Sequence, residues 1–474
     1  MKPTECIGEQ LSFQGLEQRQ VVADFSAGSV TSDAGGLLLR EVAEGSRILR
    51  SFAGCFTDHR DPELIEHSVA ELVAQRVYAL ALGYEDVNDH DELRRDPLLA
   101  TLVGKLDPTG QSRRREGDRG NPLAGKSTVN RLELADPEKA AGHRYHKIVC
   151  DSEAVDRFFV DVFLNAYETP PAVIVLDLDA TDDPVHGGQE GRFFHGYYGC
   201  YCYLPLYIFA GDHLLLARLR PSNIDAAAGA LDELRRIVGQ IRARWPKVRL
   251  IVRGDSGFAR NEIMTWCEGN RVDYVFGLAQ NARLCAAIAR QLRKSQRRYH
   301  QTKQASRRYR DFRYQTRDSW DRSRRVVGKA EYLEKGANPR FVVTSLSKAE
   351  YTAQTLYEDL YCARGDMENR IKEQQLDLFA DRTSTSFMRS NQLRLWLSSV
   401  AYVLLSELRR VGLQGTELAR AQCSTIRNKL LKIGALVSVT VRRVWIRFAS
   451  GYPYKALLAE ILNNVRAAYY PLQT

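Results

Sequence analysis

The chain has 474 residues, of which 44% are hydrophobic and 27% charged, a composition typical of a globular protein large enough for several structural units. The longest apolar-leaning run, Leu395–Leu405, is too short to cross a bilayer, and the first ten residues lack the apolar core of a secretory signal, so we expect no membrane segment and no export. The nine cysteines are scattered and form no CxxC pair, which argues against a disulfide framework or a zinc ribbon and favours a reducing cytoplasm.

The net charge of +10 is concentrated in one segment. Arg290–Lys329 holds fifteen Lys or Arg against three acidic residues, so the rest of the chain is close to neutral. The same segment contains five aromatic residues: Tyr299, Tyr309, Phe312, Tyr314 and Trp320. Basic and aromatic side chains together are typical of nucleic-acid binding, whereas the simpler alternative is a solvated charged excursion that binds nothing.

The first part of the chain, residues 1–150, is predicted to be mostly helical. Apolar residues recur at helical spacing from Leu64 to Leu82, after an Asp61-Pro62 pair that is typical of a helix start. GNPLAGKS, residues 120–127, matches the phosphate-binding pattern of nucleotide hydrolases letter for letter. No buried strand precedes it, and Pro122 lacks a backbone N–H donor, so we interpret it as a loop before a helix 128–134 capped by Ser127.

Residues 172–278 have the pattern of a mixed sheet. We expect strands at 172–179, 196–209, 213–220, 248–255 and 272–278, with helices at 223–244 and 262–268. No helix fits between the first three strands, so these should run antiparallel. Cys200 and Cys202 alternate along a strand and are interpreted as packing residues, and His186 and His195 as structural residues or DNA contacts rather than metal ligands.

This order of elements resembles the ribonuclease H-like fold. The resemblance implies that the first and fourth strands are neighbours, which would place Asp179 and Asp255 side by side at the strand ends. Two such carboxylates repel each other, and a bound cation would offset the repulsion. A third carboxylate follows in the segment 356–377, where Tyr361, Arg364 and Glu368 fall on one helix face. Taken alone, that face could equally be a surface array of ion pairs.

Taken together, these residues resemble the DDE transposases of bacterial insertion sequences. The resemblance rests on Asp179 in an Asp-x-Thr pattern, Asp255 in RGDSGF, and Tyr361-x-x-Arg364-x-x-x-Glu368. It is strongest to the insertion-sequence family conventionally numbered thirteen-eighty. It extends to three further stretches, DFSAGSVTSDAGGLLLREV, DATDDPVHGGQEGRFFHGYYGCYCYLPL and NQLRLWLSSVAYVLL, and so covers nearly the whole chain.

The resemblance implies a catalytic site that works with metal ions. Asp179, Asp255 and Glu368 would hold two Mg²⁺ or Mn²⁺ ions for DNA strand cleavage and strand transfer. Tyr361 and Arg364 would contact DNA. Relatives often carry a lysine seven residues after the glutamate, but this chain has Gln375 there, and we expect Lys372 to take that role.

The resemblance also implies the partners and the domain organisation. Transposon-end inverted repeats and target DNA would be the partners of a homodimer in the bacterial cytoplasm, associated with the nucleoid and not with a membrane. Within the basic segment, Arg307, Arg308 and Arg310 would bind DNA. We expect an α/β protein with a helical, DNA-end-binding region 1–150, a ribonuclease H-like core at 151–285 and 348–410, a basic β-rich insertion at 286–347 and a C-terminal region 411–474.

Two alternatives remain open from the sequence. VLDLDAT, residues 175–181, fits the pattern of haloacid-dehalogenase phosphatases, in which Asp177 would be the nucleophile and Asp179 the general acid. That fold needs parallel strands joined by helices, whereas the residues after Asp179 have antiparallel signals. The other alternative is a transposase-derived DNA-binding protein that has lost catalysis.

Overall fold

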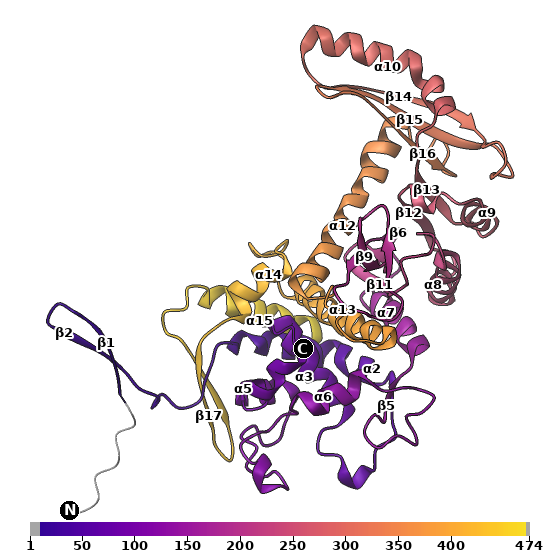
Figure 1. Cartoon of the computed structure of the whole chain (residues 1–474). Helices are drawn as coiled ribbons and strands as arrows, with labels where there is room; N and C mark the ends of the chain where they lie inside the picture. Colours follow the sequence, from indigo (N-terminus) through magenta and orange to yellow (C-terminus); the bar gives the residue numbers. More distant parts are fainter. Residues whose placement is uncertain (1–9, 471–474) are drawn as a thin grey trace, which may run out of the picture. The chain divides into compact units, whose positions relative to one another are not determined.

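The computed structural model describes residues 10–470, so Cys6 and the opening residues lie outside the described part. The chain divides into two compact units, residues 1–149 with 400–474, and residues 150–399 (Figure 1). The boundary at residue 400 falls within helix α13, Met388–Val411. The eight described cysteines are free thiols. Among the described residues, no helix combines the length and the apolar character that a membrane crossing requires.

The first unit is mainly helical, in agreement with the helical prediction for residues 1–150, and it also includes residues 400–474. Its helices are α1 Leu37–Ser46, α2 Ile48–Ala53, α3 Val69–Leu82, α4 His90–Leu93, α5 Pro97–Val103, α6 Lys126–Glu133, α14 Cys423–Ile426, η9 Arg427–Leu431 and α15 Lys455–Tyr469, with short turns η1 Ala34–Gly36, η2 Pro62–Leu64, η3 Val87–Asp89 and η4 Glu116–Asp118. Strands β1 Leu11–Leu16 and β2 Arg19–Ala23 form a hairpin, β4 Phe56–Asp58 pairs with β5 Ile148–Cys150, and β18 Val444–Phe448, β17 Ala435–Val439 and β3 Val30–Thr31 form a small sheet.

The predicted starts of two of these helices are wrong. Helix α3 begins at Val69 because the Ser68 hydroxyl accepts a hydrogen bond from the Glu71 N–H at 3.2 Å, while the Glu71 carboxylate accepts one from the Ser68 N–H. The Asp61-Pro62 pair caps only the short turn η2. Helix α6 begins at Lys126, after Gly125, so Ser127 lies inside the first turn.

The second unit is built on an eight-stranded mixed sheet with the order β11-β10-β6-β12-β13-β16-β15-β14. The strands are β6 Val173–Ala180, β10 Leu206–Ala210, β11 His213–Arg218, β12 Arg249–Gly254, β13 Asp273–Leu278, β14 Ser306–Tyr314, β15 Arg324–Leu333 and β16 Gly336–Thr344. The β6–β12 and β12–β13 pairs are parallel and the remaining neighbours are antiparallel. The expected first and fourth strands, β6 and β12, are therefore neighbours.

The predicted strand 196–209 is in fact two strands in different sheets. Pro205 interrupts it, because proline has no N–H to donate to a ladder. The first half, β9 Cys200–Tyr203, joins β7 Asp183–Pro184 and β8 Phe193–His195 in a small sheet of order β7-β9-β8. The second half, β10, pairs with β6 in the large sheet.

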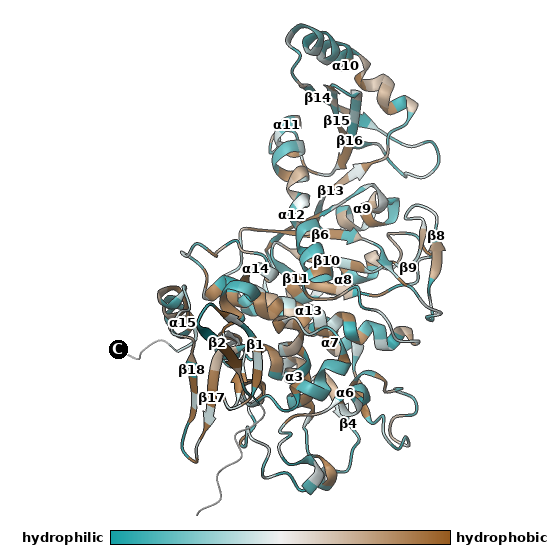
Figure 2. Cartoon of the chain, turned by 60° about the vertical axis from the view of Figure 1, so that its left-hand side comes forward, coloured by the Kyte–Doolittle hydropathy of each residue, from teal (hydrophilic) through white to brown (hydrophobic). Residues whose placement is uncertain are grey.

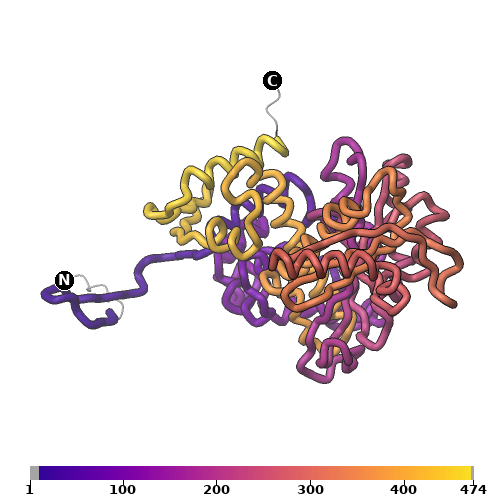
Figure 3. Tube along the Cα trace, turned by 90° about the horizontal axis from the view of Figure 1, so that it is seen from above, coloured from indigo at the N-terminus to yellow at the C-terminus, as the bar shows by residue number. Residues whose placement is uncertain are grey.

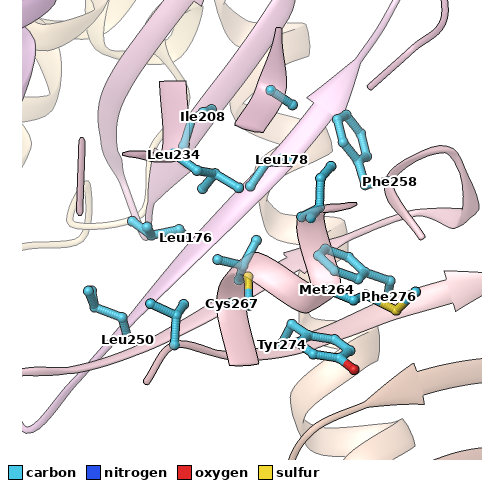
Figure 4. Packing of buried hydrophobic residues seen from close by; sticks show 14 of the residues in the cluster. Leu176, Leu178, Ile208, Leu234, Leu250, Phe258, Met264, Cys267, Tyr274 and Phe276 are labelled. Carbon is cyan, nitrogen blue, oxygen red and sulfur yellow. The ribbon is translucent and has the colours of Figure 1, made fainter. Parts of the chain in front are cut away.

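Helices cover the large sheet and complete its core. They are α7 Ser152–Asn165, α8 Ala230–Arg244, η5 Ser256–Phe258, α9 Asn261–Gly269 and α10 Ala282–Thr302. Leu176, Leu178, Leu250, Ile208 and Tyr274 from the strands meet Leu234 of α8, Met264 and Cys267 of α9, and Phe258 of η5 (Figure 4). The predicted helix 223–244 is shorter than expected, because Gly229 takes a left-handed conformation, φ 75°, and Ser222 donates its hydroxyl to the Phe193 carbonyl instead of capping the helix.

The basic segment folds as part of the same sheet. Strands β16, β15 and β14 extend it beyond β13, and α10 lies along β14 and β15 (Figures 1 and 3). Tyr314 and Trp320 are buried there, so these two of the five aromatic residues pack inside the protein. After β16 the chain forms one long helical segment of α11 Ala353–Thr355, η6 Leu356–Tyr361, η7 Cys362–Arg364, α12 Gly365–Lys372 and η8 Glu373–Asp377.

A buried ion pair joins the two central strands. Arg253 of β12 lies opposite Asp177 of β6, and the two side chains are 8% and 5% exposed. The Arg253 Nε and Nη2 donate to the two Asp177 carboxylate oxygens, the second bond at 2.7 Å. Burial raises the pKa of Asp177 in spite of this partner. The third donor, Nη1, reaches the Leu360 carbonyl of η6.

Replacement of Asp177 by Ala should lower the free energy of unfolding by about 3–5 kcal/mol, because the buried Arg253 charge loses its partner. Denaturant titration followed by circular dichroism measures the change. Asp232→Ala, which removes a carboxylate paired with an arginine on the surface of α8, is the matched control and should change stability by about 1 kcal/mol at most. The double variant Asp177→Leu/Arg253→Met should be more stable than Asp177→Ala, and the opposite order would contradict this account.

Candidate active site

Two aspartates lie at the carboxyl ends of neighbouring parallel strands. Asp179 is the penultimate residue of β6, and Asp255 directly follows β12. The strands are in register with Leu178 opposite Gly254, so Asp179 and Asp255 are the next residues along each strand. The Asp255 carboxylate accepts a hydrogen bond from the Gly257 N–H at 2.8 Å and so caps the turn η5. The sheet thus brings two carboxylates from distant parts of the sequence to one edge.

Arg364 connects this edge to the third acidic residue. Its Nη1 lies 3.1 Å from Asp179 Oδ1, and its Nη2 lies 2.6 Å from Glu368 Oε1, one helical turn further along. The expected helix face of Tyr361, Arg364 and Glu368 therefore faces the strand ends. A single guanidinium holds carboxylates from β6 and α12 together.

The electrostatics of Asp179 reflect its crowded surroundings. Burial raises the pKa of Asp179 to about 6, with the charges of Asp255 and Glu368 acting in the same direction and Arg364 opposing them. Since the pKa of Asp179 in the folded state is above the ordinary value of 3.8, the protonated side chain contributes to the free energy of unfolding. This contribution is fully present below pH 3.8 and is lost as the pH rises through about 6. At neutral pH the site carries negative charge that a bound cation would stabilise.

The donor chemistry of this edge suits a hard divalent cation. Carboxylate oxygens are the ligands that Mg²⁺ and Mn²⁺ prefer. As they stand, the described residues include no group of three or more His, Cys, Asp or Glu side chains arranged to hold a metal ion. Arg364 bonds to one carboxylate oxygen of Asp179 and one of Glu368, and so competes with a cation for these two oxygens.

Gly277 is a site residue that the sequence analysis missed. A Cβ atom at this position of β13 would lie 2.6 Å from the Tyr361 hydroxyl and 2.9 Å from the Ser256 backbone nitrogen. Only glycine lets the Tyr361 side chain approach the turn that begins at Asp255. Tyr361 is partly buried and its ring packs against Tyr357 at 5.5 Å. The position of Gly277 in the strand pattern VDYVFGL does not indicate this close approach.

The remaining predicted site residues have varied surroundings. Lys372 is exposed at the end of α12, and the Gln375 amide donates to the Asp182 carbonyl at 3.0 Å behind the site. In β14, Arg307 bonds to Glu331 at 2.6 Å, and Arg310 donates to the Ala287 carbonyl of α10. Arg308, like Arg307 and Arg310, is an exposed residue of this strand.

A basic groove follows the outer side of β14. Its volume is about 780 Å³, and it is lined by Arg290, Gln291 and Lys294 of α10, Arg307, Arg308, Tyr309 and Asp311 of β14, and Lys348, Thr352, Ala353, Gln354 and Glu358. Five of these residues are basic and two are acidic. Because β14 is the last strand in the sheet order, one edge of its backbone also faces outward. The groove therefore combines positive charge with backbone and side-chain hydrogen-bonding groups.

Comparison with known families identifies the chain. A model of the family described as transposase DDE domain group 1 matches residues 13–469. The chain belongs to this family. The match spans both units and assigns a transposase function to this DDE protein.

Two further comparisons add little to the DDE family assignment. No curated protein matches the chain. Among solved structures, a piggyBac transposase synaptic complex with hairpin DNA, seen by cryo-electron microscopy, is similar over 85% of this chain and 80% of that chain. The sequence identity is 11% and the TM-score is 0.40.

The residues of the competing motifs serve the fold instead. The next two strands of the large sheet after β6, β10 and β11, run antiparallel, whereas a haloacid-dehalogenase fold needs successive parallel strands joined by helical crossovers, and Asp177 is buried against Arg253. At the nucleotide-binding look-alike, no strand of the described chain leads into α6. The Asp91 carboxylate accepts a hydrogen bond from the Lys126 N–H at 3.0 Å and also pairs with the Lys126 ammonium. A side chain of the protein thus lies where a phosphate would bind.

Gly277→Ala should lower DNA cleavage at least about tenfold, because the added methyl group forces Tyr361, and with it the helix that carries Arg364 and Glu368, away from Asp255. Gly239→Ala is the matched control, since a Cβ there meets open space on the exposed side of α8. It should keep wild-type cleavage and gain up to about 1 kcal/mol of stability. Cleavage rates and melting temperatures of both variants test the idea, and wild-type rates in folded Gly277→Ala would refute it.

Proposed function

We propose that this DDE-family chain is an insertion-sequence transposase that cleaves and joins DNA at the ends of its element. The observation that carries the proposal is the arrangement of Asp179, Asp255 and Glu368 around Arg364 at the carboxyl ends of two parallel strands. Three acidic side chains from separate segments, one of them with a pKa raised to about 6, are typical of a site that binds cations and acts on phosphodiesters.

In this proposal the three acidic residues are the ligands of two Mg²⁺ or Mn²⁺ ions. When bound, such ions lower the pKa of a water molecule and stabilise the charge that develops on the scissile phosphate. The chain's own part is to place the ligands: β6 and β12 fix the two aspartates, and α12 brings Glu368 to them. Arg364, once released from Asp179 and Glu368, has a planar set of donors that fits phosphate oxygens.

The sheet of the second unit supports a ribonuclease H-like core. In the order β11-β10-β6-β12-β13 the first three strands in the sequence are antiparallel, and the next two are parallel to β6. We propose that residues 151–285 and 348–410 form this core, that 286–347 is a DNA-binding insertion, and that 1–150 and 411–474 are further regions of the transposase, the first contacting the transposon end.

The DNA partners follow from the charge of the insertion. We propose that the groove beside β14 binds the phosphate backbone of the transposon-end repeats, with Arg308 and Lys294 among the contacts, and that Lys372 and Tyr361 contact DNA nearer the catalytic site. A homodimer would hold the two ends together and present them to target DNA. Such an enzyme would act on the bacterial nucleoid in the cytoplasm.

The first test of the proposed function is metal-dependent cleavage of DNA that contains the repeats flanking the gene. Asp255→Asn and Glu368→Gln should abolish cleavage in Mg²⁺ while end binding stays close to wild type, because each removes a metal ligand. Asp366→Asn is the matched control: it removes an exposed carboxylate two residues from Glu368 and should leave cleavage unchanged. Full cleavage by either ligand variant would overturn the proposal, and end binding by a wild-type protein that never cleaves would favour the non-catalytic alternative.

The second test concerns the groove. Lys294→Ala/Arg308→Ala should weaken end binding and reduce the slope of log affinity against log salt concentration by about 0.9 for each DNA phosphate that is no longer neutralised. The control pair Arg235→Ala/Lys247→Ala removes the same charge from surfaces outside the groove, and its slope should match that of the wild type. Fluorescence anisotropy over a range of salt concentrations measures both. Equal slopes for all three proteins would show that the groove does not meet DNA.

A further inference from the structure

Large aromatic side chains are exposed on the hairpin that follows the catalytic strand. Strands β8 and β9 carry Phe194 and Tyr201, which are 58% and 49% exposed, and the turn between them carries Tyr197, which is 87% exposed. Figure 2 shows β8 as a hydrophobic strand at the edge of its unit. Side chains of this size are usually buried, so a cluster on the surface indicates a binding site.

Three side chains share one face of the hairpin. Phe194 and Tyr201 are directly paired across β8 and β9, and their rings meet edge to face at 5.6 Å. The Arg192 guanidinium lies 4.7 Å from the centre of the Tyr201 ring. The result is a surface of two rings and one cation, which we call the aromatic face (Arg192, Phe194 and Tyr201).

The hairpin is held in place beside the catalytic residues. The Tyr198 hydroxyl donates to the Ala180 carbonyl, one residue after Asp179, at 3.3 Å. Burial raises the pKa of Tyr198, and the negative charges of Asp182, Asp179 and Asp255 add to this shift, so these carboxylates act on the turn. On the other side, Ser222 donates to the Phe193 carbonyl and the Tyr203 hydroxyl to the Glu190 carbonyl. The aromatic face is therefore preformed and does not depend on a flexible loop.

The charge of the hairpin indicates what could bind there. Residues 191–203 contain one arginine and one histidine and no acidic residue. A cation over an aromatic ring favours a planar, electron-rich group attached to an anionic backbone, which describes a nucleotide. A paired base in a duplex is already stacked on its neighbours, so only an unpaired base can offer its face to these rings.

We propose that the aromatic face stacks unpaired bases of the DNA strand next to the point of cleavage, with Tyr197 at the tip of the same hairpin. This rests on the proposed function and deepens it: the enzyme would bind transposon ends whose flanking base pairs are open. The stacked bases would hold the strand in place while its phosphodiester lies at Asp179 and Asp255.

The test compares two forms of the same transposon-end DNA, one fully paired and one with a short unpaired flank that contains 2-aminopurine. Binding is measured by anisotropy in a Glu368→Gln background, so that the DNA stays intact. Phe194→Ala/Tyr201→Ala should bind the open end about tenfold more weakly, since one stacked base contributes about 1–3 kcal/mol and 1.4 kcal/mol is a factor of ten. Binding of the paired end should stay unchanged, and the quenching of 2-aminopurine by the protein should be lost.

The control variant Phe194→Tyr/Tyr201→Phe keeps both rings and should retain the affinity and the quenching. Circular dichroism and melting temperature show whether the alanine variant is folded. If the alanine variant is folded and binds the open end as the wild type does, the aromatic face does not stack bases. The proposed function is still supported in that case if the wild-type protein cleaves the DNA. If this folded alanine variant also loses self-association in sedimentation, the aromatic face is an interface between two copies of the protein. A wild-type protein that binds neither DNA would overturn both proposals together.

Discussion

The guanidinium of Arg253 ties together the three segments on which the site is built. It belongs to β12, two residues before Asp255, it pairs with Asp177 of β6, two residues before Asp179, and it donates to the Leu360 carbonyl, next to Tyr361. Each of these bonds involves a residue that comes one or two positions before a side chain of the site in the sequence. Because the pair is buried, any shift of one segment relative to the others would separate charges inside the protein at a cost of several kcal/mol. Arg253 thus stabilises the register of β6 against β12 and the position of the segment that carries Tyr361.

The site that Arg253 supports contains three acidic residues and one arginine, and so has a surplus of negative charge. Burial, with the charges of Asp255 and Glu368 added to it, keeps the pKa of Asp179 raised even with Arg364 beside it. Arg364 pairs with two of these carboxylates, those of Asp179 and Glu368, and keeps Glu368 directed at the strand end. A site whose charges were fully neutralised would have little affinity for the metal ions that we propose bind here.

Much of this arrangement could be predicted from local patterns. The strands at Asp179 and Asp255 are marked by apolar runs that end in an aspartate, and the helix face of Arg364 and Glu368 follows from their spacing alone. That β6 and β12 are neighbours was implied by the resemblance of the element order to the ribonuclease H-like fold. These features depend on residues close to each other in the chain or on topology, which sequence patterns describe well.

What could not be predicted depends on interactions between distant residues. Nothing near Gly277 shows that Tyr361 will approach it, and nothing near Arg253 reveals that it bonds to both Asp177 and the Leu360 carbonyl. The proline that splits β9 from β10 and the capping box at Ser68 were visible in the sequence but were outweighed by stronger apolar signals. Similarly, the basic and aromatic composition of residues 290–329 did not distinguish Trp320, which packs in the core, from Arg308, which faces outward.

The position of β14 at the end of the large sheet has a consequence for solubility. An outer strand offers unpaired N–H and C=O groups that can pair with the same strand of another molecule, and natural proteins prevent this with charged side chains on the edge. Arg307, Arg308, Arg310 and Arg313 give β14 this protection, because two such strands brought together would repel each other. Evolution can therefore change the charge of this strand only within limits, since a variant that lost several of these arginines would face aggregation before any change in its affinity for a ligand could matter.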